Sequence, residues 1–88
     1  MIEMRRQING KIYDTTTAEF IATIAHRGGP NDFSHECTQL FKTKKGAFFL
    51  AGYGGPMSRW KRRASDENGW LDGEGLTPIT MLEARNLV

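Results

Sequence analysis

Apolar residues along this chain recur at two spacings, one typical of a helix and one typical of strands. Helical spacing relates four of them: Phe20, Ile21, Ile24 and Ala25. Ahead of them, Thr16 and Glu19 form a capping box, in which each side chain bonds an otherwise unpaired backbone N–H group. The glycine at position 28 favours the left-handed conformation that ends helices. The pattern therefore predicts a main helix over residues 17–27.

Two hairpins are predicted beside this helix. Asn9-Gly10 tolerates the positive φ angles of a type I′ turn, so it joins two short strands near the N-terminus. Residues 37–43 and 47–53 have the composition of two further strands, joined by a bulged turn with a glycine at its end. Their predicted register has four opposite pairs: Phe41 and Phe49, Gln39 and Ala51, Leu40 and Leu50, and Lys42 and Phe48. Both faces of this hairpin therefore carry apolar side chains.

The C-terminal third adds a strand and a helix. Turn residues at Asn68-Gly69 and over 72–75 precede a short third strand over 76–79. Thr80 and Glu83 then form a second capping box, which opens a short C-terminal helix. The predicted order is β-β-α-β-β-β-α.

We therefore expect a small α+β fold, one domain over residues 1–88, in which an antiparallel sheet packs on one main helix plus the short C-terminal helix. Two helices do not easily cover both faces of a small sheet. A loop, a partner or a second copy in a homodimer is expected to complete one face.

Length and composition restrict the class of protein. The 88 residues allow one domain, and a chain with 39% hydrophobic and 25% charged residues is typical of globular proteins. No apolar run approaches the roughly 18 residues of a membrane span, so no membrane partner is expected. The single cysteine, Cys37, cannot form an internal disulfide, which favours a cytoplasmic location.

The net charge of +2 conceals an uneven distribution. Residues 1–63 hold eleven Lys and Arg against five Asp and Glu, whereas residues 64–88 hold one against five. The acidic side chains that follow the last basic run are Asp66, Glu67, Asp72 and Glu74. Either this acidic segment folds back on the basic one, or the two form separate surfaces, or the charges are merely solvated. These alternatives stay open at this point.

Residues able to bind a metal or act as a nucleophile are few. His35, Glu36 and Cys37 are consecutive, and consecutive residues of a strand point to opposite faces. The paired ligand spacings of structural zinc sites are missing. An enzyme that uses His26, His35 and Cys37 would need these side chains to converge in space. The sequence therefore predicts no catalytic residue, no metal site and no cofactor.

The sharpest feature is a run of four cations around one tryptophan, formed by Arg59, Trp60, Lys61, Arg62 and Arg63. Tyr53 precedes this run, and further cations at the tip of the predicted hairpin could extend it: Lys42, Lys44 and Lys45. Such side chains neutralise phosphates and stack on bases, and they also anchor protein interfaces. A third interpretation places Trp60 in the core with solvated charges around it.

The chain also carries a set of sequence blocks: INGKIYDT at 8–15, TAE at 17–19, TKKG at 43–46, FL at 49–50, GGPMS at 54–58 and PIT at 78–80. With these blocks it resembles a family of small uncharacterised proteins of bacteria, their phages and mobile elements. The resemblance implies an accessory protein, and some members look like inhibitors of host defence, notably anti-CRISPR proteins. Such inhibitors bind an effector and block its nucleic-acid channel or its assembly.

Residues and resemblance together predict a non-enzymatic, phage- or mobile-element-encoded inhibitor of a bacterial defence effector, which is a protein or nucleoprotein complex. The expected contact residues are Tyr53, Arg59, Trp60, Lys61, Arg62 and Arg63, with Lys44 and Lys45 in addition. The alternative is a small basic DNA- or RNA-binding domain that uses the hairpin and the 59–63 cluster.

Overall fold

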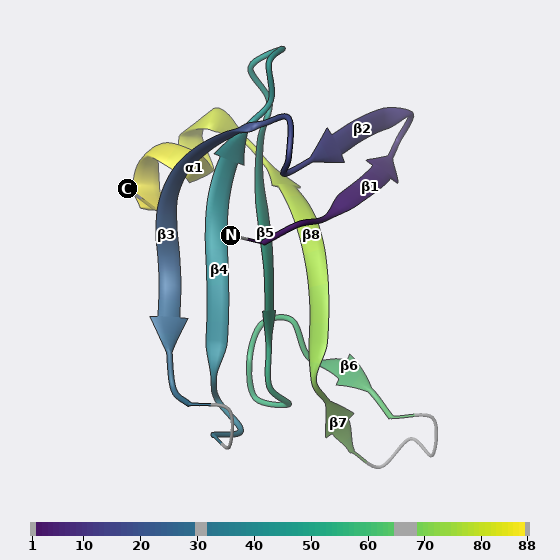
Figure 1. Cartoon of the computed structure of the whole chain (residues 1–88), viewed down its shortest axis with the longest axis vertical. Helices are drawn as coiled ribbons and strands as arrows, with labels where there is room; N and C mark the ends of the chain where they lie inside the picture. The colour runs from purple at the N-terminus through teal and green to yellow at the C-terminus, as the bar shows by residue number, and fades with distance from the viewer. Residues whose placement is uncertain (1, 30–31, 65–68, 88) are drawn as a thin grey trace.

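A four-stranded antiparallel sheet forms the centre of the molecule, with strand order β3-β4-β5-β8 (Figure 1). The computed structural model describes residues 2–29, 32–64 and 69–87. The sheet strands are β3 Glu19–Arg27, β4 Glu36–Lys42, β5 Phe48–Gly54 and β8 Gly73–Ile79. Two small two-stranded ribbons and one helix complete the fold: β1 Arg5–Ile8 with β2 Lys11–Asp14, β6 Arg62–Arg63 with β7 Trp70–Leu71, and α1 Met81–Leu87.

The architecture is therefore mostly β, and the prediction of an α+β fold with a main helix packed on the sheet is wrong. The segment that was expected to be helical is β3, the edge strand that pairs with β4. The capping box predicted for Thr16 and Glu19 does not form either. The backbone N–H and hydroxyl of Thr16 both donate to the Asp14 carboxylate, at 2.9 and 2.7 Å, in a side-chain turn that precedes the strand.

Irregular pairing explains why β3 has a helical apolar pattern. The register with β4 shifts between Phe20 and Ala22 and again between Thr23 and Ala25, so Ile21 and Ile24 are extra residues of the kind that a β-bulge inserts. Each shift resets the alternation of side chains between the two faces. Ile21 and Ile24, three positions apart, consequently both pack against the same core cluster. A spacing of three in a doubly bulged strand resembles the spacing of a helix face.

The turns and the central hairpin follow the sequence prediction. Asn9 and Gly10 have φ angles of 53° and 79°, as a type I′ turn requires, and Gly46 has a φ of 93° in the β4–β5 turn. All four predicted pairs of the central hairpin occur in the register of β4 with β5.

The predicted C-terminal elements are also present. The expected third strand is confirmed as β8, although it begins at Gly73 rather than within the predicted segment. The second capping box is confirmed too, because Thr80 N donates to Glu83 Oε1 at 2.9 Å and Glu83 N donates to Thr80 Oγ1 at 3.1 Å. Asn68, which was assigned to a turn, lies outside the described residues.

Different segments of the chain cover the two faces of the sheet. On one face, Tyr13 of β2 and Met4, which directly precedes β1, form a cluster with Phe41, Phe49 and Ala51. On the opposite face, which we call the helix face, α1 and the loop after β5 contribute Ala84 and Trp60 to a cluster with Leu40 and Leu50. A ribbon and a loop thus cover the area that two helices could not. A homodimer stays a prediction.

In the described part of the chain, no helix is both long enough and apolar enough to cross a membrane.

Candidate binding surface

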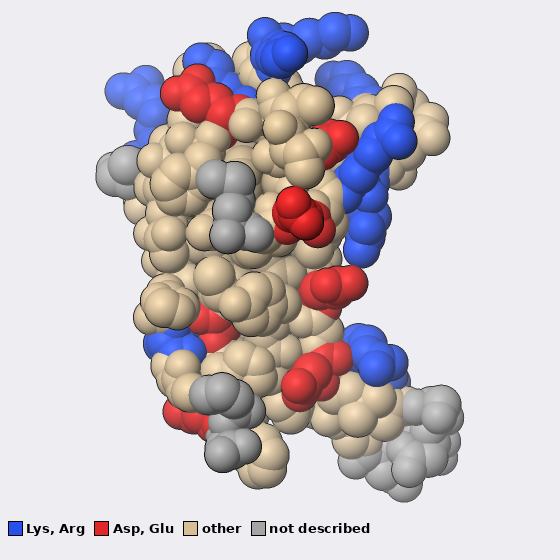
Figure 2. Space-filling view, viewed as in Figure 1, with Lys and Arg blue, Asp and Glu red and all other residues tan. Residues whose placement is uncertain are grey.

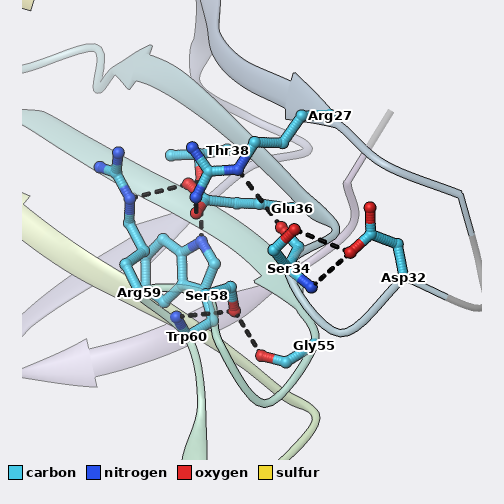
Figure 3. A network of polar contacts seen from close by, with 9 residues as sticks. All are labelled: Arg27, Asp32, Ser34, Glu36, Thr38, Gly55, Ser58, Arg59 and Trp60. Carbon is cyan, nitrogen blue, oxygen red and sulfur yellow. Dashed lines mark hydrogen bonds and ion pairs between the residues drawn. The ribbon is translucent and has the colours of Figure 1, made fainter.

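Trp60 lies in the core, so its ring is not available as a surface contact. Its exposed fraction is 8%, and its indole Nε1 donates a 2.8 Å hydrogen bond to Thr38 Oγ1 on β4 (Figure 3). The ring packs on the helix face against one cross-strand glycine pair, Gly52 and Gly75. The adjacent pair, Gly54 and Gly73, lies against Ser58 and the Trp60 backbone. A Cβ atom on Gly75 would lie 2.9 Å from Cε3 of the indole. This burial agrees with the interpretation that places Trp60 in the core, and a direct contact between Trp60 and a partner stays a prediction.

Glu36 connects this tryptophan to two arginines. The Thr38 hydroxyl donates to Glu36 Oε2 at 2.6 Å, and Arg59 Nε and an Arg27 guanidinium nitrogen lie 2.8 and 3.1 Å from the carboxylate (Figure 3). Burial of the Glu36 side chain, which is 1% exposed, would raise its pKa. The hydrogen bond from Thr38 and the charges of the two arginines outweigh burial and hold the pKa of Glu36 below its ordinary value. Arg59 is thus paired with a buried carboxylate, and only the exposed part of its side chain can contact a partner.

The loop after β5 is fixed by short hydrogen bonds. Gly55 N donates to His35 O at 2.9 Å, and the Ser58 hydroxyl donates to Gly55 O at 2.8 Å. Ser58 Oγ also accepts from Trp60 N at 3.2 Å, which orients the indole toward the sheet. This loop leads directly into β6. The hydrogen bonds of the loop therefore determine the position of Arg62 and Arg63 relative to the sheet.

The exposed tryptophan of the basic region is Trp70, which the sequence reasoning missed. It is 45% exposed and lies opposite Arg63 in the β6–β7 ribbon. Lys61 Nζ lies over its ring at 4.4 Å from the centroid, and Arg63 Cζ lies over it at 5.0 Å. Both distances are within the range of cation–π attraction. The signal that could have found Trp70 is the Asn-Gly dipeptide that precedes it in the sequence, since this dipeptide is typical of hairpin turns.

Arg62 points to the other face of the ribbon and links it to the sheet. Its Nε donates to the backbone oxygen of Asp72 at 2.9 Å. Arg62 and Asp72 line a groove of about 480 Å³ together with Tyr53 and Glu74. Tyr53 is 46% exposed and is therefore accessible next to the ribbon. We call Tyr53, Lys61, Arg62, Arg63 and Trp70 the ribbon surface.

Lys44 and Lys45 are far from the ribbon surface. They occupy the β4–β5 turn, next to the Phe48 and Ile79 end of the sheet, whereas β6 and β7 adjoin the Gly54 and Gly73 end. Figure 1 shows the two regions at opposite ends of the longest axis, along which the molecule extends 40 Å. The prediction that the hairpin tip extends the 59–63 cluster into one patch is wrong.

Comparisons of this chain with protein-family models, curated proteins and solved structures give no match. The resemblance to small phage and mobile-element proteins therefore stays an expectation.

Among the described residues, the acidic segment only partly folds back on basic side chains. The Glu74 carboxylate lies 3.9 Å from the Arg6 guanidinium, and Asp72 receives Arg62 through its backbone oxygen rather than its side chain. Asp66 and Glu67, which also belong to this segment, lie outside the described residues.

His26, His35 and Cys37, the candidate catalytic side chains, line one groove. His26, Cys37, Tyr53 and Glu74 are successive cross-strand partners and form one row across the sheet. His35 joins His26 and Cys37 at a groove of about 300 Å³, with its Nδ1 2.7 Å from the Asp32 carbonyl oxygen.

Two observations bear on the chemistry of this row. The neighbouring thiol of Cys37, with a contribution from burial, raises the pKa of Tyr53. In residues 2–29, 32–64 and 69–87, no three His, Cys, Asp or Glu side chains are grouped so that they could hold a metal ion.

Proposed function

We propose that this chain is a non-enzymatic binding protein whose ribbon surface contacts an acidic patch on a partner protein. The partner we propose is a bacterial defence effector, and the chain would act as its inhibitor in the bacterial cytoplasm. The resemblance to phage and mobile-element proteins supports the choice of partner. The charge and exposure of the ribbon surface support the mode of contact.

One observation carries the proposal, the placement of Trp70. A half-exposed indole with Lys61 and Arg63 against its ring includes Trp and Arg, two of the side chains that most often dominate protein interfaces. Tyr53 adds a second exposed ring beside the groove that Arg62 lines. Because Trp60 and Arg59 hold the loop before β6, that loop needs little ordering when the chain binds.

The sign of the charge favours one mode of inhibition. A nucleic-acid channel of an effector is positively charged, so it would repel a surface with three cations. An acidic surface that the effector uses for assembly would attract the same cations. We therefore propose that the chain blocks assembly rather than the nucleic-acid channel.

The ribbon surface is less suited to nucleic acid than to protein. Lys61 and Arg63 already lie over the Trp70 ring, so a base that stacked there would compete with these cations. The nucleic-acid alternative that joins the hairpin tip with the 59–63 cluster would need one continuous surface, and these regions lie at opposite ends.

Size-exclusion chromatography with purified candidate effectors, followed by a target-cleavage assay, tests the proposal. We expect the wild-type chain to co-elute with an effector and to reduce cleavage, and Trp70→Ala to weaken both effects at least tenfold. Lys44→Gln/Lys45→Gln is the matched control for co-elution, because it removes two cations at the other end and should leave co-elution with an effector free of nucleic acid unchanged. Loss of binding in the control but not in Trp70→Ala would contradict the proposal, as would a lack of co-elution with every effector tested.

A further inference from the structure

A second basic region surrounds a groove at the end of the molecule opposite the ribbon surface. The groove has a volume of about 520 Å³ and lies between the β1–β2 turn and the β4–β5 turn. Lys11 contributes from the first turn, and Lys44 and Lys45 contribute from the second. Figure 2 shows basic side chains gathered at this upper end, over the β4–β5 turn.

The three lysines are free to meet a ligand. All three are exposed, and no ion pair among the described residues involves any of them. The one acidic side chain that lines the groove is Asp14. Hydrogen bonds from Thr16, together with the charge of Arg5, lower the pKa of Asp14 and engage its carboxylate. The groove therefore keeps an uncompensated positive charge.

The turn that carries two of these lysines is rigid. Thr43 N donates to Ala47 O at 2.7 Å, and Gly46 N donates to Thr43 O at 2.9 Å. Ala47 N donates to the Thr43 hydroxyl at 3.0 Å, so the Thr43 side chain adds a further hydrogen bond across the turn. The backbone positions of Lys44 and Lys45 are thus fixed before a ligand arrives, which lowers the entropy cost of binding.

We propose that this lysine groove, lined by Lys11, Lys44 and Lys45, binds the phosphate backbone of a nucleic-acid strand. Its cations come from two separate turns, so a ligand with several phosphates in series can contact both walls at once. Lysine acts as a point charge on phosphate and does not read base edges. The aromatic ring at the groove, Tyr13, is 7% exposed and cannot offer a face for stacking. Binding is therefore independent of base sequence.

This function is separate from the proposed inhibitor function, because the two surfaces share no residue. If both hold, the chain contacts an effector with its ribbon surface and a nucleic-acid strand with its lysine groove. Variants at one end should leave binding at the other end unchanged, so each proposal can fail without the other.

Fluorescence anisotropy with a labelled single-stranded oligonucleotide over a series of salt concentrations tests the lysine groove. Three neutralised phosphates give a log–log slope of affinity against salt of about −2, since each contributes about −0.7 on single strands. Lys11→Gln and Lys44→Gln/Lys45→Gln should reduce the magnitude of this slope by about 0.7 per lysine removed. Lys61→Gln/Arg63→Gln is the matched control and should change neither the affinity nor the slope.

Four outcomes would overturn the proposal: no binding at low salt, binding that the lysine variants leave unchanged, binding that the control variant abolishes, or a strong preference for one base sequence. Polyglutamate of equal charge serves as a competitor, and tighter binding of polyglutamate than of the oligonucleotide would indicate an acidic protein ligand instead. Thermal unfolding of each variant verifies that it is folded, which we expect because all the substituted side chains are exposed.

Discussion

The indole nitrogen of Trp60 donates a 2.8 Å hydrogen bond to the hydroxyl of Thr38, 22 positions earlier in the chain. The same hydroxyl donates to Glu36, which is paired with Arg59 and Arg27. One continuous set of polar contacts thus runs from the core tryptophan to two half-exposed arginines. It connects the loop before the β6–β7 ribbon to the central sheet.

The two tryptophans should contribute very differently to stability. Trp60→Ala removes a buried ring and its hydrogen bond, and we expect the free energy of unfolding to fall by about 3–5 kcal/mol. Trp70→Ala removes an exposed ring, and we expect a loss of no more than about 1 kcal/mol. Urea unfolding followed by circular dichroism measures both. Equal losses in the two variants would show that Trp60 is not the core residue.

The glycine floor beneath Trp60 should not tolerate a methyl group. In Gly75→Ala the new Cβ would lie 2.9 Å from Cε3 and 3.0 Å from Cζ3 of the indole, so the ring would have to move. We expect the free energy of unfolding to fall by about 1–3 kcal/mol, as in other overpacked cores. Gly29→Ala is the control, because nothing lies within 4 Å of that added Cβ. A stable Gly75→Ala protein with an unchanged urea midpoint would contradict the packing described above.

Acid should weaken the fold in part through Glu36. Its pKa in the folded protein lies below its ordinary value of 4.5, so the unfolded chain binds a proton more readily. The stabilisation from the ionised carboxylate is therefore complete above pH 4.5 and is lost as the pH falls through the lower folded-state value. Glu36→Gln should cost about 1.5–3 kcal/mol at neutral pH, because it removes charged hydrogen bonds.

The difference in unfolding free energy between Glu36→Gln and the wild type should shrink below pH 4.5. Asp14, Asp32 and Glu83 also have lowered pKa values, but they are present in both proteins and cancel in the comparison. Urea unfolding at several pH values measures this difference. A difference that stays constant across the acid range would show that the pKa of Glu36 is the same in the folded and the unfolded protein.

Substitutions on the two faces of the bulged strand β3 should change the free energy of unfolding by different amounts. Ile24 packs against the cluster on the helix face, whereas Thr23 is exposed. We expect Ile24→Ala to lower the free energy of unfolding by about 2 kcal/mol, since the side chain is only partly buried. Thr23→Ala should change it by less than about 0.5 kcal/mol. A loss in Thr23→Ala as large as that in Ile24→Ala would contradict this arrangement of β3.

The failures of sequence reasoning came from long-range contacts. Residues 19–27 look helical because Ile21 and Ile24 are three positions apart, and that spacing reflects two register shifts against β4. Nothing local reveals these shifts, since they exist only when the two strands pair. Which of the two tryptophans is buried also depends on long-range contacts. Trp60 is buried because Gly52 and Gly75, on adjacent strands, leave room for one indole, and the sequence placed Gly75 in a turn.

The sequence by itself determined the short-range features: the Asn9-Gly10 turn, the register of β4 with β5, and the Thr80–Glu83 cap. Each depends on residues a few positions apart, whose preferred backbone angles and hydrogen bonds hold in almost any surroundings. Only the tertiary structure decided which ring is exposed, which arginine is tied to a buried carboxylate, and that the basic residues form two surfaces rather than one. Those outcomes depend on which strands become neighbours, and the packing of apolar side chains across the sheet sets that choice.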